Sequence, residues 1–379
     1  MAYCATPTCT LPLHHVLNWS PFRIDALGII TMIGAEQVNS AIGRLVRSRY
    51  TEYLPLLGAF VFASDQFADA KSGFALYNLT AGIMTTDIAG WFSRWCMSQG
   101  FERSSSRVVW TVNDRSRRKK GCLRGPQTAD GVLASIIGTV VNATLLAITI
   151  LQGDWWGFAN AVSMVLSVAV RAYVVQQNRN ALDAAAEKAL HETNSEAKIE
   201  KILVILSDAR MVTMYVPANV VYRCFVSKPD LKHKRLYYNI RMVGWAGFAV
   251  QVVSLGMSGL ATQLVTVSIM VMATIATHFH IGCQEEIVAT RLCAAKGEFG
   301  PNRTRRKDVY AALELEGHEE ESMLAWNLMP HKTTPSATSW WTSYMKDKEE
   351  YKKRRSGENT VPQHGSIHSG ALKKDECMV

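Results

Sequence analysis

The sequence has three long runs that contain no Asp, Glu, Lys or Arg. The longest extends over the 43 residues from Met242 to Gln284, and two shorter ones cover Val132–Gly153 and Trp155–Val170. Soluble proteins scatter charged residues between their buried positions, because charged side chains are rarely buried unless they are paired. Charge-free runs of this length are typical of helices in a bilayer, whose hydrocarbon core takes about 20 apolar residues to cross. The runs therefore exclude an ordinary soluble domain and predict an integral membrane protein.

The sequence also lacks the motifs of the common catalytic and cofactor-binding sites. It has no phosphate-binding loop, no HExxH, no GxSxG and no dinucleotide fingerprint. Its eight cysteines form no CxxC pair, so they indicate neither a zinc site nor a disulfide framework. His278, His280 and Cys283 are close in sequence, but helix residues two apart point to different faces. We therefore expect no catalytic residue, no cofactor and no metal site, and a protein that is not an enzyme.

The apolar runs predict two helical hairpins. Residues 132–175 contain only two charged residues, Arg171 near their end and Asp154 in Gly153-Asp154, which is the expected turn of the first hairpin. The 43-residue run would measure about 65 Å as one helix at ~1.5 Å per residue, roughly twice the hydrocarbon core. It must therefore fold back, and its glycine-rich segment 256–259 is the expected turn of a second hairpin over residues 242–283.

Basic residues flank these hairpins and are absent from both turns. Segment 94–124 holds nine Lys or Arg against two acidic residues. Under the positive-inside rule, the segments between and after the hairpins are then cytosolic, the C-terminus included, and the turns lie outside. Asp154, Trp155 and Trp156 are expected at the outer membrane surface, because indole rings favour the headgroup level. The net charge of +9 is explained by these flanks, so no nucleic-acid partner is expected.

Residues 176–241 predict a small α+β insert. Residues 180–201 are rich in Ala and Glu, which favour a helix. Two β-branched apolar runs, Lys201–Ser207 and Met211–Val216, flank the polar tripeptide 208–210. This pattern predicts a β-hairpin within residues 199–226 that turns at the tripeptide.

The two ends of the chain are less regular. Residues 1–23 contain three prolines and are expected to form an arm. Residues 24–95 contain apolar stretches that are short or interrupted by polar groups, so either additional spans or interfacial helices fit them. Residues 284–379 hold fifteen basic and fifteen acidic residues and are expected to be a largely disordered tail.

These patterns predict an all-α membrane bundle of two transmembrane hairpins, with a small α+β cytosolic insert and a disordered C-terminal tail. The sequence does not decide whether residues 24–95 add further membrane spans. The expected division is an N-terminal arm (1–23), a region of additional membrane or interfacial helices (24–95), a basic cytosolic linker (96–131), the first transmembrane hairpin (132–175), a cytosolic insert (176–241), the second transmembrane hairpin (242–283) and a largely disordered cytosolic tail (284–379).

Five polar residues within the spans are candidates for function: Asn142, Asn160, Arg171, Gln251 and Gln263. Polar groups in lipid are costly and often mark a transport path. The alternative for the four amides is hydrogen bonding between neighbouring helices. Arg171 lies near the cytosolic end of its helix, where it either reaches the headgroup phosphates or forms a gate or anion site.

Three segments carry a resemblance to known sequences. GDWWGFANAVSMVLSVAVR (153–171), QNRNALD (177–183) and GWAGFAVQVVSLGMSGLATQL (244–264) are distinctive as strings. Over residues 130–290 the chain resembles an uncharacterised group of filamentous-fungal multi-pass membrane proteins. The resemblance implies a multi-pass topology and no activity.

Two classes of function fit this sequence. The one that the recurring amides of both hairpins favour is an ion channel or small-solute transporter, which we expect to be a homo-oligomer because four spans enclose little interior. The second is a non-catalytic scaffold that binds cytosolic protein partners through residues 176–241 and the tail. In both classes the lipid bilayer is the main partner.

Overall fold

The computed structural model describes residues 12–13, 34–58, 60–102, 104–113, 126–192, 198–299 and 305–358. The chain divides into two compact units. The helical unit comprises residues 1–69, 118–182 and 230–285, and the sheet unit comprises residues 70–117, 183–229 and 286–379. Most of the expected N-terminal arm and residues 114–125 of the expected basic linker lie outside the described residues.

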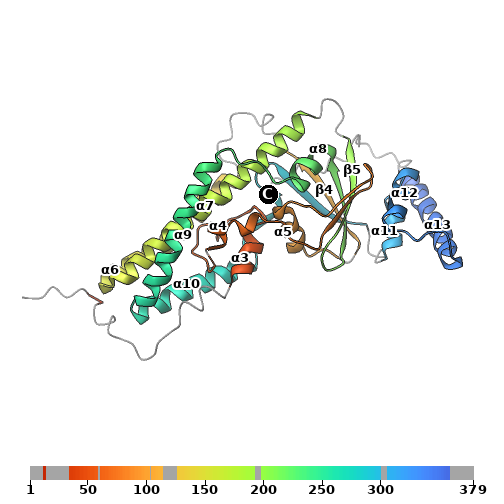
Figure 1. The fold of residues 1–379 in the computed structure, drawn as a ribbon. Helices are drawn as coiled ribbons and strands as arrows, with labels where there is room; N and C mark the ends of the chain where they lie inside the picture. Colours follow the sequence, from red (N-terminus) through yellow and green to blue (C-terminus); the bar gives the residue numbers. More distant parts are fainter. Residues whose placement is uncertain are drawn as a thin grey trace, which may run out of the picture. The chain divides into compact units, whose positions relative to one another are not determined.

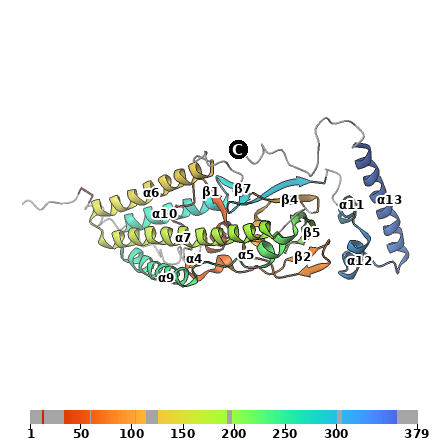
Figure 2. The same cartoon turned by 90° about the horizontal axis from the view of Figure 1, so that it is seen from above.

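Four long helices dominate the helical unit and lie side by side (Figure 1, Figure 2). All four are long and apolar enough to cross a membrane, which confirms the prediction of four such helices. They are α6 (Pro126–Gln152), α7 (Trp155–His191), α9 (Lys234–Met257) and α10 (Leu260–His278). At ~1.5 Å per residue, the 37 residues of α7 measure about 55 Å, so α7 is much longer than the hydrocarbon core is thick.

The N-terminal part of the helical unit contains only short elements within the described residues. Helix α3 (Ala35–Ile42) lies against α10, and α4 (Phe60–Ser64) lies against α9. A 3₁₀ helix, η1 (Gln66–Ala68), follows α4. None of these elements has the length of a membrane span. Among the described residues, region 24–95 therefore adds no fifth candidate span.

A mixed sheet of eight strands contradicts the predicted all-α fold. The strand order is β1-β7-β8-β4-β6-β5-β2-β3. Strand β4 runs parallel to β6, and the other pairs with a known register are antiparallel. The strands are β1 (Val46–Ser48), β2 (Ala75–Asn78), β3 (Ile83–Thr85), β4 (Ser106–Val112), β5 (Ile199–Ile205), β6 (Met211–Pro217), β7 (Cys283–Val288) and β8 (Leu292–Glu298).

The sequence does not predict this sheet, because most of its strands are short and pair with strands from distant parts of the chain. Strand β4 lies in the segment predicted as a basic linker, yet its side chains alternate between buried and exposed positions. That alternation is typical of a strand. Val108 and Trp110 are buried, and Trp110 packs against Trp91 and Phe225. Trp91 lies on helix α5 (Gly90–Ser98), whereas Phe225 lies on the π-helix η3 (Val221–Val226), which follows α8 (Ala218–Val220).

The predicted β-hairpin within residues 199–226 is confirmed. Strands β5 and β6 pair from Ile199 with Pro217 to Ile205 with Met211. In the turn, Ala209 has a left-handed φ of 64°, and Leu206 N–H donates to Arg210 O at 2.9 Å. The hairpin is not a separate insert, because β5 also pairs with β2 and β6 also pairs with β4. It forms the middle of the sheet.

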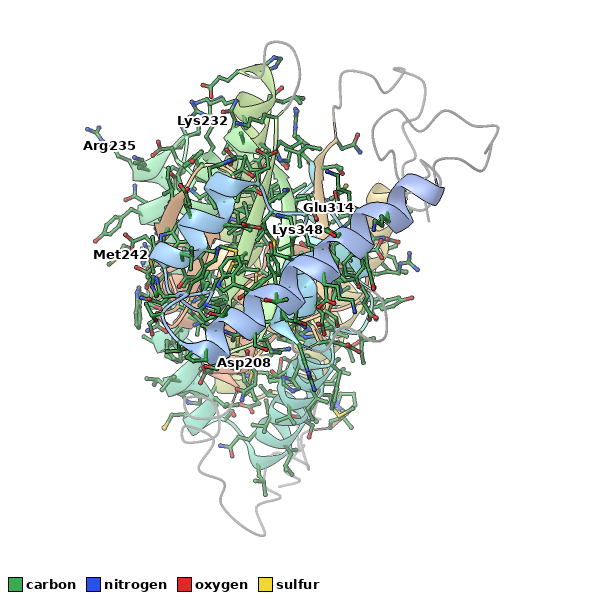
Figure 3. The ribbon with its side chains drawn as sticks, turned by 90° about the vertical axis from the view of Figure 1, so that its right-hand side faces the viewer. Asp208, Lys232, Arg235, Met242, Glu314 and Lys348 are labelled. Atoms are coloured by element: carbon green, nitrogen blue, oxygen red, sulfur yellow. The ribbon has the colours of Figure 1, made fainter. Side chains whose placement is uncertain are left out.

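The prediction of a disordered tail is wrong as far as residue 358. Beyond β7 and β8, this segment forms α11 (Arg306–Ala312), α12 (Gly317–Ala325) and α13 (Pro335–Glu358). Tyr310, Met323 and Tyr344 from these helices are buried in one apolar cluster. The charges that suggested disorder are paired: Lys307 Nζ lies 2.8 Å from Asp347, and Lys348 Nζ lies 2.6 Å from Glu320. Figure 3 shows Lys348 on α13.

Candidate functional site

The turns of the two hairpins lie together at one end of the helical unit. Asp154 Oδ1 accepts a hydrogen bond from Gly157 N–H at 2.9 Å, and Asp154 Oδ2 accepts one from Gly259 N–H at 2.9 Å. Thr262 Oγ1 donates to Gln152 Oε1 at 2.8 Å beside them. One carboxylate thus caps the N-termini of both α7 and α10, where the helix dipoles favour negative charge.

The residues predicted at the outer surface differ in their surroundings. Asp154 is only 4% exposed, because both of its carboxylate oxygens accept from the backbone of the two turns. Its place at the outer membrane surface stays a prediction. Trp155 is 79% exposed and Trp156 is also exposed at the start of α7. Both indoles are therefore free to contact headgroups, as their sequence position suggests.

Two of the candidate amides lie in the apolar core of the helical unit. Asn160 Nδ2 on α7 donates to Thr266 Oγ1 on α10 at 3.3 Å and to Met164 Sδ at 3.7 Å. Gln251 Nε2 on α9 donates to Met270 Sδ on α10 at 3.6 Å. Met164 and Met270 belong to one buried hydrophobic cluster. Asn160 and Gln251 therefore join α7 and α9 to α10 within an apolar core, where Asn160 Oδ1 and Gln251 Oε1 have no partner among the described residues.

The other two amides bond to nearby backbone. Asn142 Nδ2 donates to Gly138 O of its own helix at 2.7 Å. Gln263 Nε2 donates to Leu255 O and Ser258 O, at 3.0 and 3.1 Å, and so satisfies carbonyls at the end of α9. No hydrogen bond of the described residues joins any two of the four amides. Within one copy, they do not form a shared polar path.

Arg171 lies in a pocket that contains two further buried arginines. Its Nη2 donates to Glu52 O at 2.7 Å and to Leu54 O at 2.6 Å. Arg44, Arg171 and Arg179 are 1%, 4% and 2% exposed, and all three line the same pocket, together with Glu52. The structure thus places Arg171 against a loop of the protein.

Arg44 and Arg179 each have a carboxylate partner. Arg179 Nη1 pairs with Glu52 Oε1, while Nε and Nη2 donate to Leu45 O at 3.1 Å and Val46 O at 2.8 Å. Arg44 Nη1 pairs with Glu285 Oε1 at 3.2 Å. These bonds attach residues 44–54 to α7 and to the segment after α10. This loop therefore forms one side of the pocket.

The pocket carries an excess of positive charge. Three guanidinium groups meet the two carboxylates of Glu52 and Glu285. Arg44 Nη2 lies 2.8 Å from His280 Nδ1, and burial, followed by the charge of Arg44, lowers the pKa of His280. A neutral imidazole accepts this hydrogen bond and adds no charge. Cys283 also lines the pocket, and burial raises the pKa of its thiol, which keeps it uncharged.

Two further spaces adjoin the arginine pocket, which has a volume of about 40 Å³. A polar pocket of about 70 Å³ shares Ser48 and Glu52 with it and is also lined by Arg49 and Asp130. Arg49 Nε lies 2.7 Å from Asp130 Oδ1, and this hydrogen bond raises the pKa of Arg49. A third space, a groove of about 370 Å³, lies between α6 and α7.

Of this pocket, only Arg171 is predicted as a site residue from the sequence. Arg44 stands in a triplet with Arg47 and Arg49, which suggests nothing more specific than a membrane surface. Arg179 follows Arg171 by eight residues, a little more than two helical turns. That spacing, next to a charge-free run, is the signal from which a second arginine of the site could have been found.

Comparisons with protein-family models, with curated proteins and with solved structures found no match to this chain.

Proposed function

We propose that this protein is a non-catalytic membrane scaffold, in which four spans hold a folded sheet unit that binds cytosolic protein partners. The observation that supports this proposal most is the hydrogen bond of Asn160 to a neighbouring helix. This in-span amide is fully buried and hydrogen-bonds across to Thr266 within an apolar core. Gln251, in the same core, has a thioether as its partner. Such contacts stabilise helix packing and offer no wetted surface to a solute.

The multi-pass topology rests on the four apolar helices. The resemblance of residues 130–290 to filamentous-fungal multi-pass proteins is part of this proposal and supports topology alone. A channel or transporter would require the same amides to line water, which demands a homo-oligomer with a different arrangement around them.

Flux measurements separate the two functions. Purified protein in vesicles is expected to pass no more K⁺ or small solute than protein-free vesicles, for the wild type and for Asn160→Leu. The variant loses the bond to Thr266, which costs about 0.6 kcal/mol for an average interhelical hydrogen bond. Flux through the wild type that Asn160→Leu abolishes, with expression and oligomer size unchanged, would establish permeation and reject the scaffold.

The proposed orientation places both turns outside and residues 176–241 and the C-terminus in the cytosol, on the charge asymmetry of the flanks. Met257 and Lys232 are both exposed and lie towards opposite ends of α9 (Figure 3 shows Lys232). An impermeant thiol reagent on intact cells is expected to label Met257→Cys and to spare Lys232→Cys, with the wild type reporting labelling of native thiols. The opposite pattern would reverse the orientation.

A further inference from the structure

The guanidinium of Arg171 is incompletely satisfied by the protein. Both of its hydrogen bonds come from Nη2 and go to neutral backbone carbonyls, and Nε and Nη1 have no acceptor among the described residues. Glu52, the carboxylate of the pocket, is already paired with Arg179. A buried charge is unfavourable unless an opposite charge accompanies it. The geometry therefore leaves room for one anionic group beside Arg171.

The depth of Arg171 indicates where such an anion comes from. Arg171 lies 16 residues after Trp155, which corresponds to about 24 Å along α7. The hydrocarbon core is about 30 Å thick and Trp155 lies at its opposite surface, so Arg171 is close to the headgroups of the far leaflet. The acidic groups that occur at this level in a membrane belong to lipids.

The groove between α6 and α7 extends from this level into the membrane. It shares Ala172 with the arginine pocket and Tyr53 with the polar pocket. Along α6 it is lined from Ser135 to Leu146, about 17 Å, and along α7 from Ala172 back to Val165. On α6 these residues lie around the middle of the helix, and on α7 they lie 10 to 17 residues after Trp155. The groove therefore descends from the level of Arg171 by about the depth of one leaflet. A groove of this course matches an alkyl chain that descends from a headgroup.

We propose that the helical unit binds an anionic membrane lipid, with its acidic headgroup, a phosphate or carboxylate, at the arginine pocket and one alkyl chain in the groove between α6 and α7. Arg171 supplies the unsatisfied donors, while Arg44 and Arg179 neutralise Glu285 and Glu52, so that the charge of Arg171 stays available to the headgroup. The headgroup stays accessible through the polar pocket that joins the two spaces at Glu52 and Tyr53. This proposal is independent of the scaffold function, because it concerns only the helical unit and its lipid.

Two matched pairs of variants test the headgroup and the chain separately. Arg171→Met removes the charge in the pocket, and Arg235→Met removes an exposed arginine that points away from the helical unit (Figure 3). Ala143→Phe fills the groove, whereas Ala147→Phe adds the same ring to an exposed position of α6 outside the groove. The second pair leaves every charge in place and so keeps the test valid if Arg171→Met fails to fold.

The measurement is the thermal midpoint of the purified full-length protein in detergent, with added phosphatidic acid, phosphatidylcholine or inorganic phosphate. Phosphatidic acid is expected to raise the midpoint by about 5 °C at concentrations far above the Kd, with no shift from the other two. Arg171→Met and Ala143→Phe should lose the shift, and their controls should keep it. An equal shift from phosphatidylcholine or from inorganic phosphate, or an unchanged shift in Ala143→Phe, would overturn the proposal.

Discussion

Replacement of Asp154 by alanine is expected to lower the free energy of unfolding by about 3–6 kcal/mol, the loss of two hydrogen bonds to a charged group. The carboxylate accepts from the backbone of two different hairpins, at Gly157 and Gly259. The substitution leaves both N–H groups without this acceptor in a site from which water is largely excluded. It also removes the negative charge from the N-termini of α7 and α10. The loss should therefore exceed that of an ordinary helix cap.

Unfolding of the purified protein by denaturant measures this effect. Asp154→Asn keeps one oxygen acceptor and is expected to lose roughly half as much stability. Asp230→Ala removes an exposed carboxylate of the same unit and should change the unfolding free energy by no more than about 0.5 kcal/mol. If Asp154→Ala behaves like Asp230→Ala, the carboxylate does not hold the two turns together.

The spans could be predicted from the sequence because their cause is local. A window of about 20 residues decides whether a helix tolerates lipid, and no distant part of the chain is needed for that decision. The sheet has the opposite character. Strand β2 pairs with β5, and β4 pairs with both β6 and β8, all across long stretches of chain. The pairs β2–β3, β5–β6 and β7–β8 are local, and the sequence predicts only β5–β6, whose two strands are long β-branched apolar runs.

The candidate site shows the same division. Asn160 and Arg171 were found because polar groups in an apolar run are conspicuous. Their partners were not, because Thr266 and the carbonyls of Glu52 and Leu54 come from other segments. The loop 44–54 belongs to region 24–95, for which the sequence predicts additional spans or interfacial helices. Tertiary packing buries Arg44, and this arginine lines the arginine pocket.

The pocket also explains why the loop is ordered against α7. Arg179 donates to the carbonyls of Leu45 and Val46, and Arg171 donates to those of Glu52 and Leu54. Carbonyl groups in a buried loop need donors, and guanidinium groups supply several in one plane. The arginines therefore have a structural role in the loop. The proposed lipid headgroup would bind Nε and Nη1 of Arg171, which do not take part in that role.

Replacement of Arg179 by methionine is expected to lower the free energy of unfolding by about 3–5 kcal/mol, the usual cost of breaking a buried ion pair from one side. Methionine keeps most of the side-chain volume, so the loss of unfolding free energy measures the effect of removing the charge and hydrogen bonds of Arg179. The Glu52 carboxylate is left without its guanidinium partner, and two backbone carbonyls lose their donors. Because the loop forms the wall of the arginine pocket, the variant should also lose the thermal shift with phosphatidic acid.

A double-mutant cycle with Glu52→Gln isolates the ion pair from the rest of this loss. The glutamine keeps an acceptor for Ser48 N–H but carries no charge, so Glu52→Gln in the Arg179→Met background should recover part of the stability. Recovery is expected to be incomplete, because the carbonyls of Leu45 and Val46 remain without donors. Strict additivity of the two single losses would mean that Glu52 and Arg179 are not coupled. The excess positive charge assigned to the pocket would then be wrong as well, since that charge balance assumes that Glu52 is already neutralised by Arg179.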